Sequence, residues 1–149
     1  MEVRRYSPEV LAHYGVKGMH WGERRWQNED GTLTEAGKSH YGRSIKRIQK
    51  LENRANILKK KAVKHNKKAA DYEFKSLKAW TEKGARRLYY KSKKQARKAA
   101  RKEWRATKKI EKGKKIYTNL RNEFKDADIS TVDKSYIDYG KKYANKYLK

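Results

Sequence analysis

Residues 31–39 read GTLTEAGKS and come close to the glycine-rich loop that binds nucleotide phosphates. That loop has four residues between its first glycine and its Gly-Lys pair, whereas five separate Gly31 from Gly37. No buried strand precedes the segment and no apolar strand ending in aspartate follows it, so its amides lack a sheet edge from which to reach a phosphate. The overlapping NEDGTLT, residues 28–34, lacks the alternating carboxylates and terminal glutamate of a calcium loop. We therefore expect no nucleotide hydrolysis and no calcium site here, only a turn at Asp30 and Gly31.

Histidines are the other candidate metal ligands. His13, His20 and His40 fall within the first 42 residues, and Glu29 or Asp30 could supply a fourth ligand to zinc. Their spacing matches no zinc-binding pattern, and isolated histidines commonly serve packing and hydrogen bonding. We predict no metal and no cofactor, with these three histidines as the group from which a zinc site could form.

No grouping of side chains indicates catalysis. Cysteine is absent, which excludes thiolate chemistry, disulfides and cysteine zinc sites. No Ser/His/Asp grouping is recognisable, and the acidic residues are scattered where they can pair with Lys or Arg on helices. We therefore predict that the protein is not an enzyme.

Basic residues remain as the candidates for a functional surface. The chain has 42 Lys and Arg against 17 Asp and Glu, a net charge of +25. Residues 1–41 carry six basic and six acidic side chains, residues 42–112 carry 27 and 6, and residues 113–149 carry 9 and 5. The excess basic side chains in residues 42–112 repel one another, and together they attract phosphate or an acidic protein surface.

On helices, these cations would form stripes able to follow a phosphate backbone. Four aromatic residues lie among them and could stack on bases or fill thin seams between helices: Trp80, Tyr89, Tyr90 and Trp104. No recognised DNA-binding motif indicates base-specific readout. DNA, RNA and an acidic protein surface all stay open as the partner. The predicted binding residues are Lys59, Lys60, Lys61, Lys64, Lys67, Lys68, Arg86, Arg87, Lys91, Lys93, Lys94, Arg97, Lys98, Arg101, Lys102 and Arg105.

The spacing of apolar residues predicts a first long helix that positions part of this surface. Thr34 is a good N-cap for a helix that pauses at Gly37 and again at Gly42. Beyond it, a helix over about 43–82 carries a coiled-coil-like seam. The predicted seam residues are Ile48, Leu51, Ala55, Leu58, Ala62, His65, Ala69, Tyr72, Ser76 and Ala79, widened by Ile45, Ile57, Phe74, Leu77 and Trp80. His65 is thus expected to be a seam residue rather than a ligand, and Gly84 to end the helix.

A second helix is predicted over about 85–112, with an alanine-rich stripe that permits close approach but buries little area. Its members are Leu88, Ser92, Ala96, Ala99, Glu103, Ala106 and Ile110, with Trp104 beside them. We expect Gly113 to break this helix, followed by a short amphipathic helix presenting Ile116, Tyr117, Leu120 and Phe124. A last helix, capped by Ser130 or Thr131, presents Val132, Tyr136, Tyr139, Tyr143 and Tyr147.

The expected fold is all-α: a long antiparallel helical hairpin with shorter C-terminal helices and a glycine-rich N-terminal head. We divide the chain into a head (1–42), a basic hairpin (43–112) and C-terminal helices (113–149). Alternatively, part of the near-repetitive central segment fluctuates without a partner. No apolar run approaches the roughly 18–20 residues of a membrane span and the first residues lack a signal-peptide core, so we expect no membrane partner and a cytoplasmic location.

Residues 13–42, HYGVKGMHWGERRWQNEDGTLTEAGKSHYG, resemble a module of proteins from phages and prophages of Firmicutes. Its typical pattern is H-x-G-[IV]-K-G-[MQ]-K-W-G-[VL]-R-R-[FY]-Q-N-E-D-G-[ST]-L-T-x-x-G-x-x-R-Y-G. The chain departs from it at His20, Glu23, Trp26 and His40. The match covers 30 of 149 residues.

The resemblance implies a mobile-element origin and a head that docks on a protein partner, and it carries over no catalytic residue. Trp21 and Trp26 are the expected packing anchors. The predicted docking residues are His13, Lys17, Met19, Trp21, Arg24, Arg25 and Trp26.

Three functions follow as hypotheses. In the first, a non-enzymatic phage or prophage protein binds nucleic acid through its basic helices in the host cytoplasm, as a component of the virion or an accessory of DNA packaging. In the second, an anti-CRISPR-type inhibitor blocks a Cas nuclease or its guide-RNA complex. In the third, a structural scaffold pairs with acidic capsid surfaces.

Overall fold

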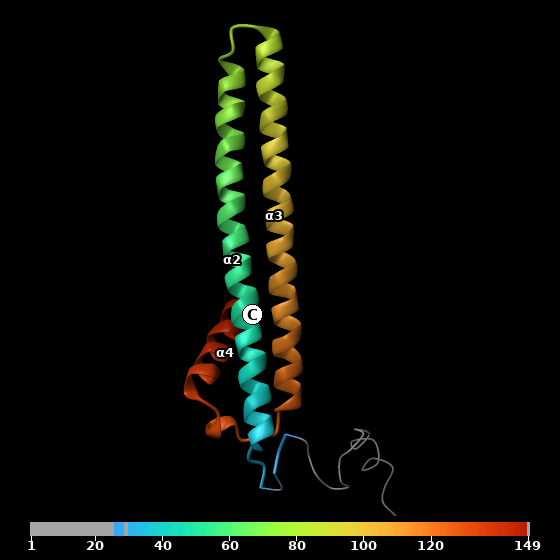
Figure 1. Ribbon diagram of the computed structural model, residues 1–149, viewed down its shortest axis with the longest axis vertical. Coiled ribbons are helices and arrows are strands. Elements are labelled where there is room, and N and C mark those ends of the chain that lie inside the picture. The colour runs from blue at the N-terminus through green and yellow to red at the C-terminus, as the bar shows by residue number, and fades with distance from the viewer. Residues whose placement is uncertain (1–25, 29, 149) are drawn as a thin grey trace, which may run out of the picture.

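The protein is an antiparallel pair of long helices with a short helix packed at one end (Figure 1). The computed structural model describes residues 26–28 and 30–148. Its elements are α2 (Glu35–Leu77), α3 (Glu82–Glu123), a 3-10 helix (Ile129–Thr131) and α4 (Lys134–Tyr147). The expected all-α antiparallel hairpin is confirmed. Most of the glycine-rich head, including the predicted residues His13, Lys17, Met19, His20, Trp21, Arg24 and Arg25, lies outside the described residues.

Two threonine caps set where the long helices begin. The Oγ1 atom of Thr34 accepts a hydrogen bond from the amide of Gly37 at 3.0 Å, as predicted, and Thr81 accepts from Gly84 at 3.2 Å. The predicted pauses at Gly37 and Gly42 are wrong, because α2 runs unbroken through both. Gly84 does not end the first helix either. It lies in the first turn of α3, after a short turn over residues 78–81.

Gly113 does not break α3, which continues to Glu123 and absorbs the segment predicted as a separate short helix. A glycine inside a helix costs about 1 kcal/mol relative to alanine. Here Gly113 is buried, and a Cβ atom would meet the hydroxyl of Tyr143. That hydroxyl donates to the carbonyl of Ile110 at 3.2 Å. The close approach of Tyr143 therefore accounts for a glycine within a continuous helix.

A seven-residue repeat of small residues forms the seam between α2 and α3. The buried positions are Ile48, Ala55, Ala62 and Ala69 on α2, and Ser92, Ala99, Ala106, Gly113 and Leu120 on α3. Ile48 lies near Gly113, so counting seven residues along both helices places each alanine of α2 level with a small residue of α3. The predicted stripe of α3 is correct at Ser92, Ala99 and Ala106, but Ala96 and Glu103 are exposed. The partly buried residues between the seam positions are Gln95 and Lys102, each one residue before the position that the spacing predicts.

Four of the five residues expected to widen the seam of α2 are exposed. Ile45 is fully buried, as predicted, but Ile57, Phe74, Leu77 and Trp80 are 52%, 58%, 82% and 101% exposed. A hairpin of only two helices offers one narrow seam, so apolar residues off the seven-residue repeat face outward. Trp80 lies in the turn, where no third element among the described residues covers it.

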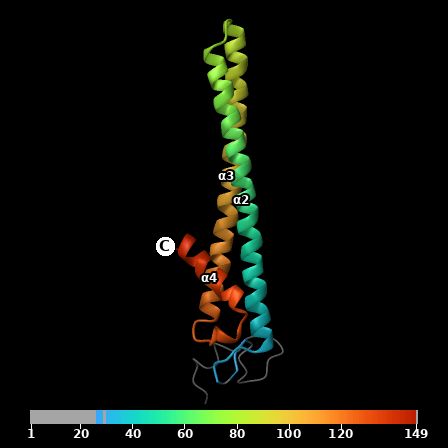
Figure 2. The ribbon, with the colours of Figure 1, turned by 90° about the vertical axis from the view of Figure 1, so that its left-hand side faces the viewer.

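α4 lies at one end of the hairpin (Figure 2). The large buried side chains gather at that end. This cluster, which we call the base, holds Leu33, Tyr41, Ile45, Ile48, Leu120, Phe124, Val132 and Tyr143. α4 begins one turn later than predicted, because Asp133 caps it by accepting from the amide of Ser135 at 2.8 Å. Ser130 and Thr131 lie in the preceding 3-10 helix. As predicted, Tyr136, Tyr139, Tyr143 and Tyr147 all pack toward the rest of the base.

α4 docks through contacts between glycines and tyrosines. A Cβ atom at Gly42 would lie 3.0 Å from the ring of Tyr136, and one at Gly140 would lie 3.2 Å from the ring of Tyr117. With Gly113 against Tyr143, each of α2, α3 and α4 contributes a glycine to this junction. Burial raises the pKa of Tyr143 to about 12, so its hydroxyl is neutral at physiological pH.

Glu52 is the polar centre of the same junction. Its carboxylate accepts hydrogen bonds from the hydroxyls of Tyr139 and Tyr147 and, at 2.7 Å, from the ammonium of Lys146. Burial alone would raise the pKa of Glu52, but hydrogen bonds from Lys146, Tyr139 and Tyr147 outweigh it, and the pKa lies below its ordinary value of 4.5. One carboxylate on α2 thus receives three donors from α4.

We predict that Gly113→Ala destabilises the protein, although alanine favours a helix by about 1 kcal/mol. The added methyl group displaces Tyr143, and overpacking a filled site costs about 1–3 kcal/mol. Thermal unfolding followed by circular dichroism should show a lower Tm. Tyr143→Phe removes the clashing oxygen, so the double variant should recover part of the loss relative to Gly113→Ala. A Tm that rises in the single variant contradicts this packing.

A second prediction concerns pH. Since the pKa of Glu52 is lower in the folded state, its carboxylate contributes stability that is complete above about pH 4.5 and is lost as pH falls through the folded-state pKa. Glu52→Gln should lower the free energy of unfolding by about 1–3 kcal/mol at pH 7. The difference from wild type should shrink as pH falls below about 4.5, where the unfolded chain takes up a proton at Glu52 more readily than the folded protein does. Asp138→Asn, at an exposed carboxylate of α4, is the control and should change Tm little at either pH. A difference that stays constant from pH 7 to 3 contradicts the assignment.

Candidate nucleic-acid interface

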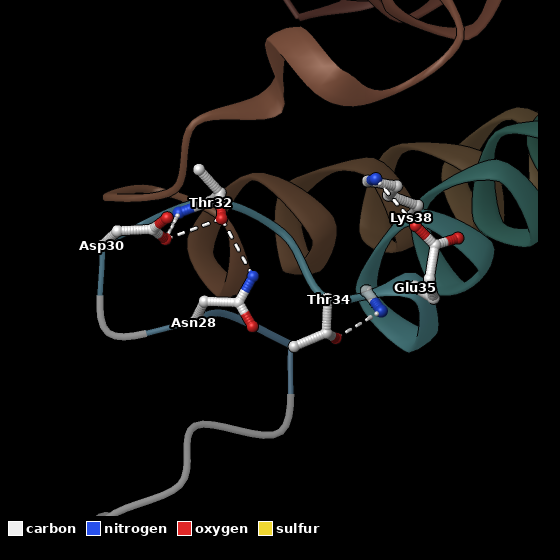
Figure 3. A network of polar contacts seen from close by, with 7 residues as sticks. Asn28, Asp30, Thr32, Thr34, Glu35 and Lys38 are labelled. Atoms are coloured by element: carbon white, nitrogen blue, oxygen red, sulfur yellow. Dashed lines mark hydrogen bonds and ion pairs between the residues drawn. The ribbon is translucent and has the colours of Figure 1, made fainter.

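The segment that comes close to a phosphate loop is part of a turn at Asp30 and Gly31, followed by the cap and first turn of α2 (Figure 3). The carboxylate of Asp30 accepts from the amide of Thr32 at 2.8 Å and from its hydroxyl at 2.6 Å. Hydrogen bonds from Thr32 lower the pKa of Asp30. Gly31 has a φ of +83°, a left-handed conformation that glycine adopts without strain. Its carbonyl accepts from the amide of Asp128 at 3.0 Å, which ties the turn to the segment after α3. The predicted turn is therefore confirmed.

The described candidates for a metal site are engaged elsewhere. The ring of His40 stacks on that of Trp26, with centroids 4.4 Å apart and planes within 9°, and its Nε2 lies 2.8 Å from a carboxylate oxygen of Glu123. His65 lies at the hairpin seam, where its Nδ1 is 2.9 Å from the side-chain oxygen of Gln95. No group of three or more His, Cys, Asp and Glu side chains suited to a metal occurs within residues 26–28 and 30–148.

Trp26, one of the predicted packing anchors, lies against the helices. Its side chain is partly buried and packs against the base, and its carbonyl accepts from the amide of Thr34 at 3.1 Å. The absence of a side chain at Gly37 leaves room for the Trp26 backbone. Within the structure, Trp26 thus packs against the protein's own helices.

The predicted basic residues come together along the part of the hairpin beyond the base. We call residues 53–70 of α2 and 83–102 of α3 the arm. The arm contains seven Lys and Arg on α2 and ten on α3, with no Asp or Glu in either segment. The two segments lie side by side because the helices are antiparallel (Figure 1). Nearly all the predicted binding residues fall within the arm.

The cations of the arm point outward. Each of its basic residues is exposed except Lys102, which is half-buried at the seam. In the described structure only Arg86 among them forms an ion pair, with Glu82 at 2.9 Å. Elsewhere carboxylates do pair with lysines, as Glu111 does with Lys108 at 3.0 Å. The arm therefore carries a large excess of exposed positive charge, and the carboxylates that reach it, Glu82 at Arg86 and Glu103 at Asn66, lie at its margins in the sequence.

The four aromatic residues among the cations, Trp80, Tyr89, Tyr90 and Trp104, are exposed rather than packed in the seam of the hairpin. Tyr90 is 71% and Trp104 is 63% exposed, and Tyr89 is 45% exposed. The alternative that they fill the seam between helices is wrong, because alanines already fill it. A groove of about 640 Å³ runs along the outer face of α3, lined by Tyr89, Tyr90, Lys93, Lys94, Arg97, Lys98 and Arg101.

Two residues of the arm were missing from the predicted set. Arg54 and Lys83 lie at its margins, and both are exposed. Neither residue has another cation next to it in the sequence, so neither belongs to a cluster of basic residues. Both lie within the stretches that contain no Asp or Glu, and that property of the sequence would have identified them.

Comparison with known proteins adds one finding. A family of unknown function (DUF7211) matches residues 3–28, which is under a fifth of the chain. No curated protein and no solved structure matches the chain. The family match ends before α2 begins, so it covers only the first part of the head and leaves out the arm. No helix in the described part of the chain is long and apolar enough to cross a membrane.

Repulsion within the arm generates a prediction. Lys64 has exposed lysines four residues away on both sides, at Lys60 and Lys68. Like charges at this spacing destabilise a helix by about 0.2–0.5 kcal/mol per pair, and opposite charges stabilise it by a similar amount. At low salt, Lys64→Glu should raise the free energy of unfolding by about 1 kcal/mol, and Lys64→Gln by about half as much. Both gains should disappear near 1 M salt, where charges are screened within about 3 Å. A lower Tm for Lys64→Glu at low salt would contradict this account.

Proposed function

We propose that the protein is a non-enzymatic binder of nucleic acid, with the arm holding the phosphate backbone independently of base sequence. The observation that carries the proposal is the arm itself, seventeen basic side chains and no acidic one over two adjacent helical segments. Because the cations are exposed and all but one lack a carboxylate partner in the described structure, they are available to phosphates. Binding then proceeds by phosphate neutralisation and release of counterions.

The shape of the arm supports the same proposal. At 1.5 Å per residue, α2 is about 64 Å long and α3 about 63 Å. The segments of the arm take up roughly 25–30 Å of that length, and B-DNA carries one charge per about 1.7 Å of its axis. A straight cationic rod of this length can contact several phosphates at once. Solubility alone does not require seventeen uncompensated charges within two short segments.

The head has a separate proposed role. The resemblance of residues 13–42 to a phage and prophage module supports a mobile-element origin, and the family match over residues 3–28 falls on the same part of the chain. We infer that this head binds a protein partner while the arm binds nucleic acid. The division follows the sequence, since residues 1–41 carry equal numbers of acidic and basic side chains.

The salt dependence of binding tests the proposal. Affinity for a mixed-sequence duplex should fall by at least tenfold between 50 and 200 mM salt, because log K falls with log salt by about 0.9 per phosphate contacted. Replacing Lys94, Lys98 and Arg101 together by Gln should reduce that slope by about two to three. Fluorescence anisotropy at several salt concentrations gives both quantities.

The matched control is Lys134, Lys141 and Lys142 replaced together by Gln. These lysines of α4 are exposed, and replacing them removes the same charge at a site outside the arm. The control should change the slope by less than one. An affinity that does not depend on salt, or an equal loss in both triple variants, would overturn the arm as the binding surface.

A further inference from the structure

We propose that the groove on α3 is a binding site for single-stranded nucleic acid, in which a base stacks on the ring of Tyr90 while neighbouring cations hold its phosphates. This inference rests on the proposed function and adds to it the class of nucleic acid and the residue that selects it. The arm explains attraction to any phosphate backbone. The groove explains why aromatic rings lie exposed among the cations.

The rings of Tyr89 and Tyr90 form a small aromatic unit at one end of the groove. Their centroids are 6.1 Å apart and their planes are inclined by 68°, an edge-to-face arrangement. The ammonium of Lys93 lies over the ring of Tyr89, 5.1 Å from its centroid, so one face of that ring is already occupied. No described cation lies over Tyr90, whose side chain is the more exposed. Tyr90 therefore offers the open surface.

Cations continue from Tyr90 along the same face of α3. Lys94, Arg97 and Arg101 follow it at spacings of four, three and four residues, which places them on one stripe of a helix. At 1.5 Å per residue the stripe from Tyr90 to Arg101 is about 16 Å long. All of these residues line the groove, together with Lys98. A base on Tyr90 would therefore have several cations available to the adjoining phosphates.

A packing role does not account for Tyr90. The seam of the hairpin is formed by Ser92, Ala99 and the small residues of α2, and Tyr90 lies on the opposite side of α3. The large side chains that stabilise the protein are in the base, and Tyr90 is absent from that cluster. An exposed ring among cations is suited to a planar, negatively charged ligand.

The exposed ring distinguishes single strands from duplexes. In a duplex the faces of the bases are stacked on one another, so the ring of Tyr90 on the outer face of α3 reaches only the backbone. In a single strand the base faces are open, and stacking on an aromatic side chain contributes about 1–3 kcal/mol per base whatever the sequence. Duplex binding then uses the cations alone, whereas single-strand binding uses the cations and Tyr90. An acidic peptide would also match the charge, but it would gain little from Tyr90.

Abasic oligonucleotides separate stacking from charge. The full chain is titrated with oligothymidylate of about 12 nucleotides and with an abasic strand of the same length, which has the same phosphates and no bases. We expect oligothymidylate to bind about 5- to 100-fold more tightly. Tyr90→Ala should reduce this ratio to near one without changing the affinity for the abasic strand or the duplex. Tyr90→Phe should keep most of the preference, because it retains the ring.

Phe74→Ala is the matched control. Phe74 is an aromatic residue of α2 that is 58% exposed and lies outside the groove, so its removal should leave the ratio unchanged. Circular dichroism should show equal helix content in all variants. If wild type binds both oligonucleotides equally, or if Phe74→Ala lowers the ratio as much as Tyr90→Ala, the groove is not a stacking site.

Failure of this inference can be told apart from failure of the proposed function. Salt-dependent duplex binding with no preference for bases would overturn the stacking site and leave the arm as a phosphate-binding surface. If neither oligonucleotide nor duplex binds at low salt, both proposals fail. Displacement of oligothymidylate by an acidic peptide with higher affinity would favour a protein partner and overturn the assignment of nucleic acid as the ligand.

Discussion

The close approach of α2 and α3 along a seam of alanine and other small residues is the constraint on which the rest of the structure depends. Ala62 and Ala99 each bury a single methyl group, and Gly113 buries none. Because hydrophobic stabilisation scales with the apolar area removed from water, such a seam holds two long helices together only weakly. Most of the stabilisation must come from elsewhere, and the base supplies it through large apolar residues and the aromatic face of α4.

The base combines shape and charge in a small volume. The glycines at its junction let the rings of Tyr117, Tyr136 and Tyr143 approach the helix backbones. The hydroxyls of two other tyrosines, Tyr139 and Tyr147, reach Glu52 together with Lys146. A buried carboxylate is costly unless its oxygens are satisfied, and three donors from α4 meet that requirement. The same contacts fix where α4 lies. The end of the molecule that holds the large buried side chains is thus separate from the arm, whose outer surface is exposed.

The exposed positive charge of the arm destabilises the hairpin. Lysines four residues apart along the arm repel one another, and the thin seam supplies little to offset the repulsion. A phosphate backbone laid along the arm would replace that repulsion with attraction. Under the proposed function, binding and stabilisation of the arm are therefore coupled, since a ligand that binds only the folded hairpin shifts its equilibrium toward the folded state.

The sequence by itself determined the helical class, the antiparallel hairpin, the Thr34 cap, the Asp30 turn and the location of the excess charge, because each follows from local spacing or from counting. Only the tertiary structure decided that α3 continues through Gly113, since a ring of distant α4 fills the space beside it. It likewise decided that Glu52 is a docking centre and that Tyr90 is exposed, because burial depends on which elements exist to cover a residue. Helical periodicity predicts which apolar side chains share one face of a helix. It cannot predict which of them are buried when two helices form only one narrow seam.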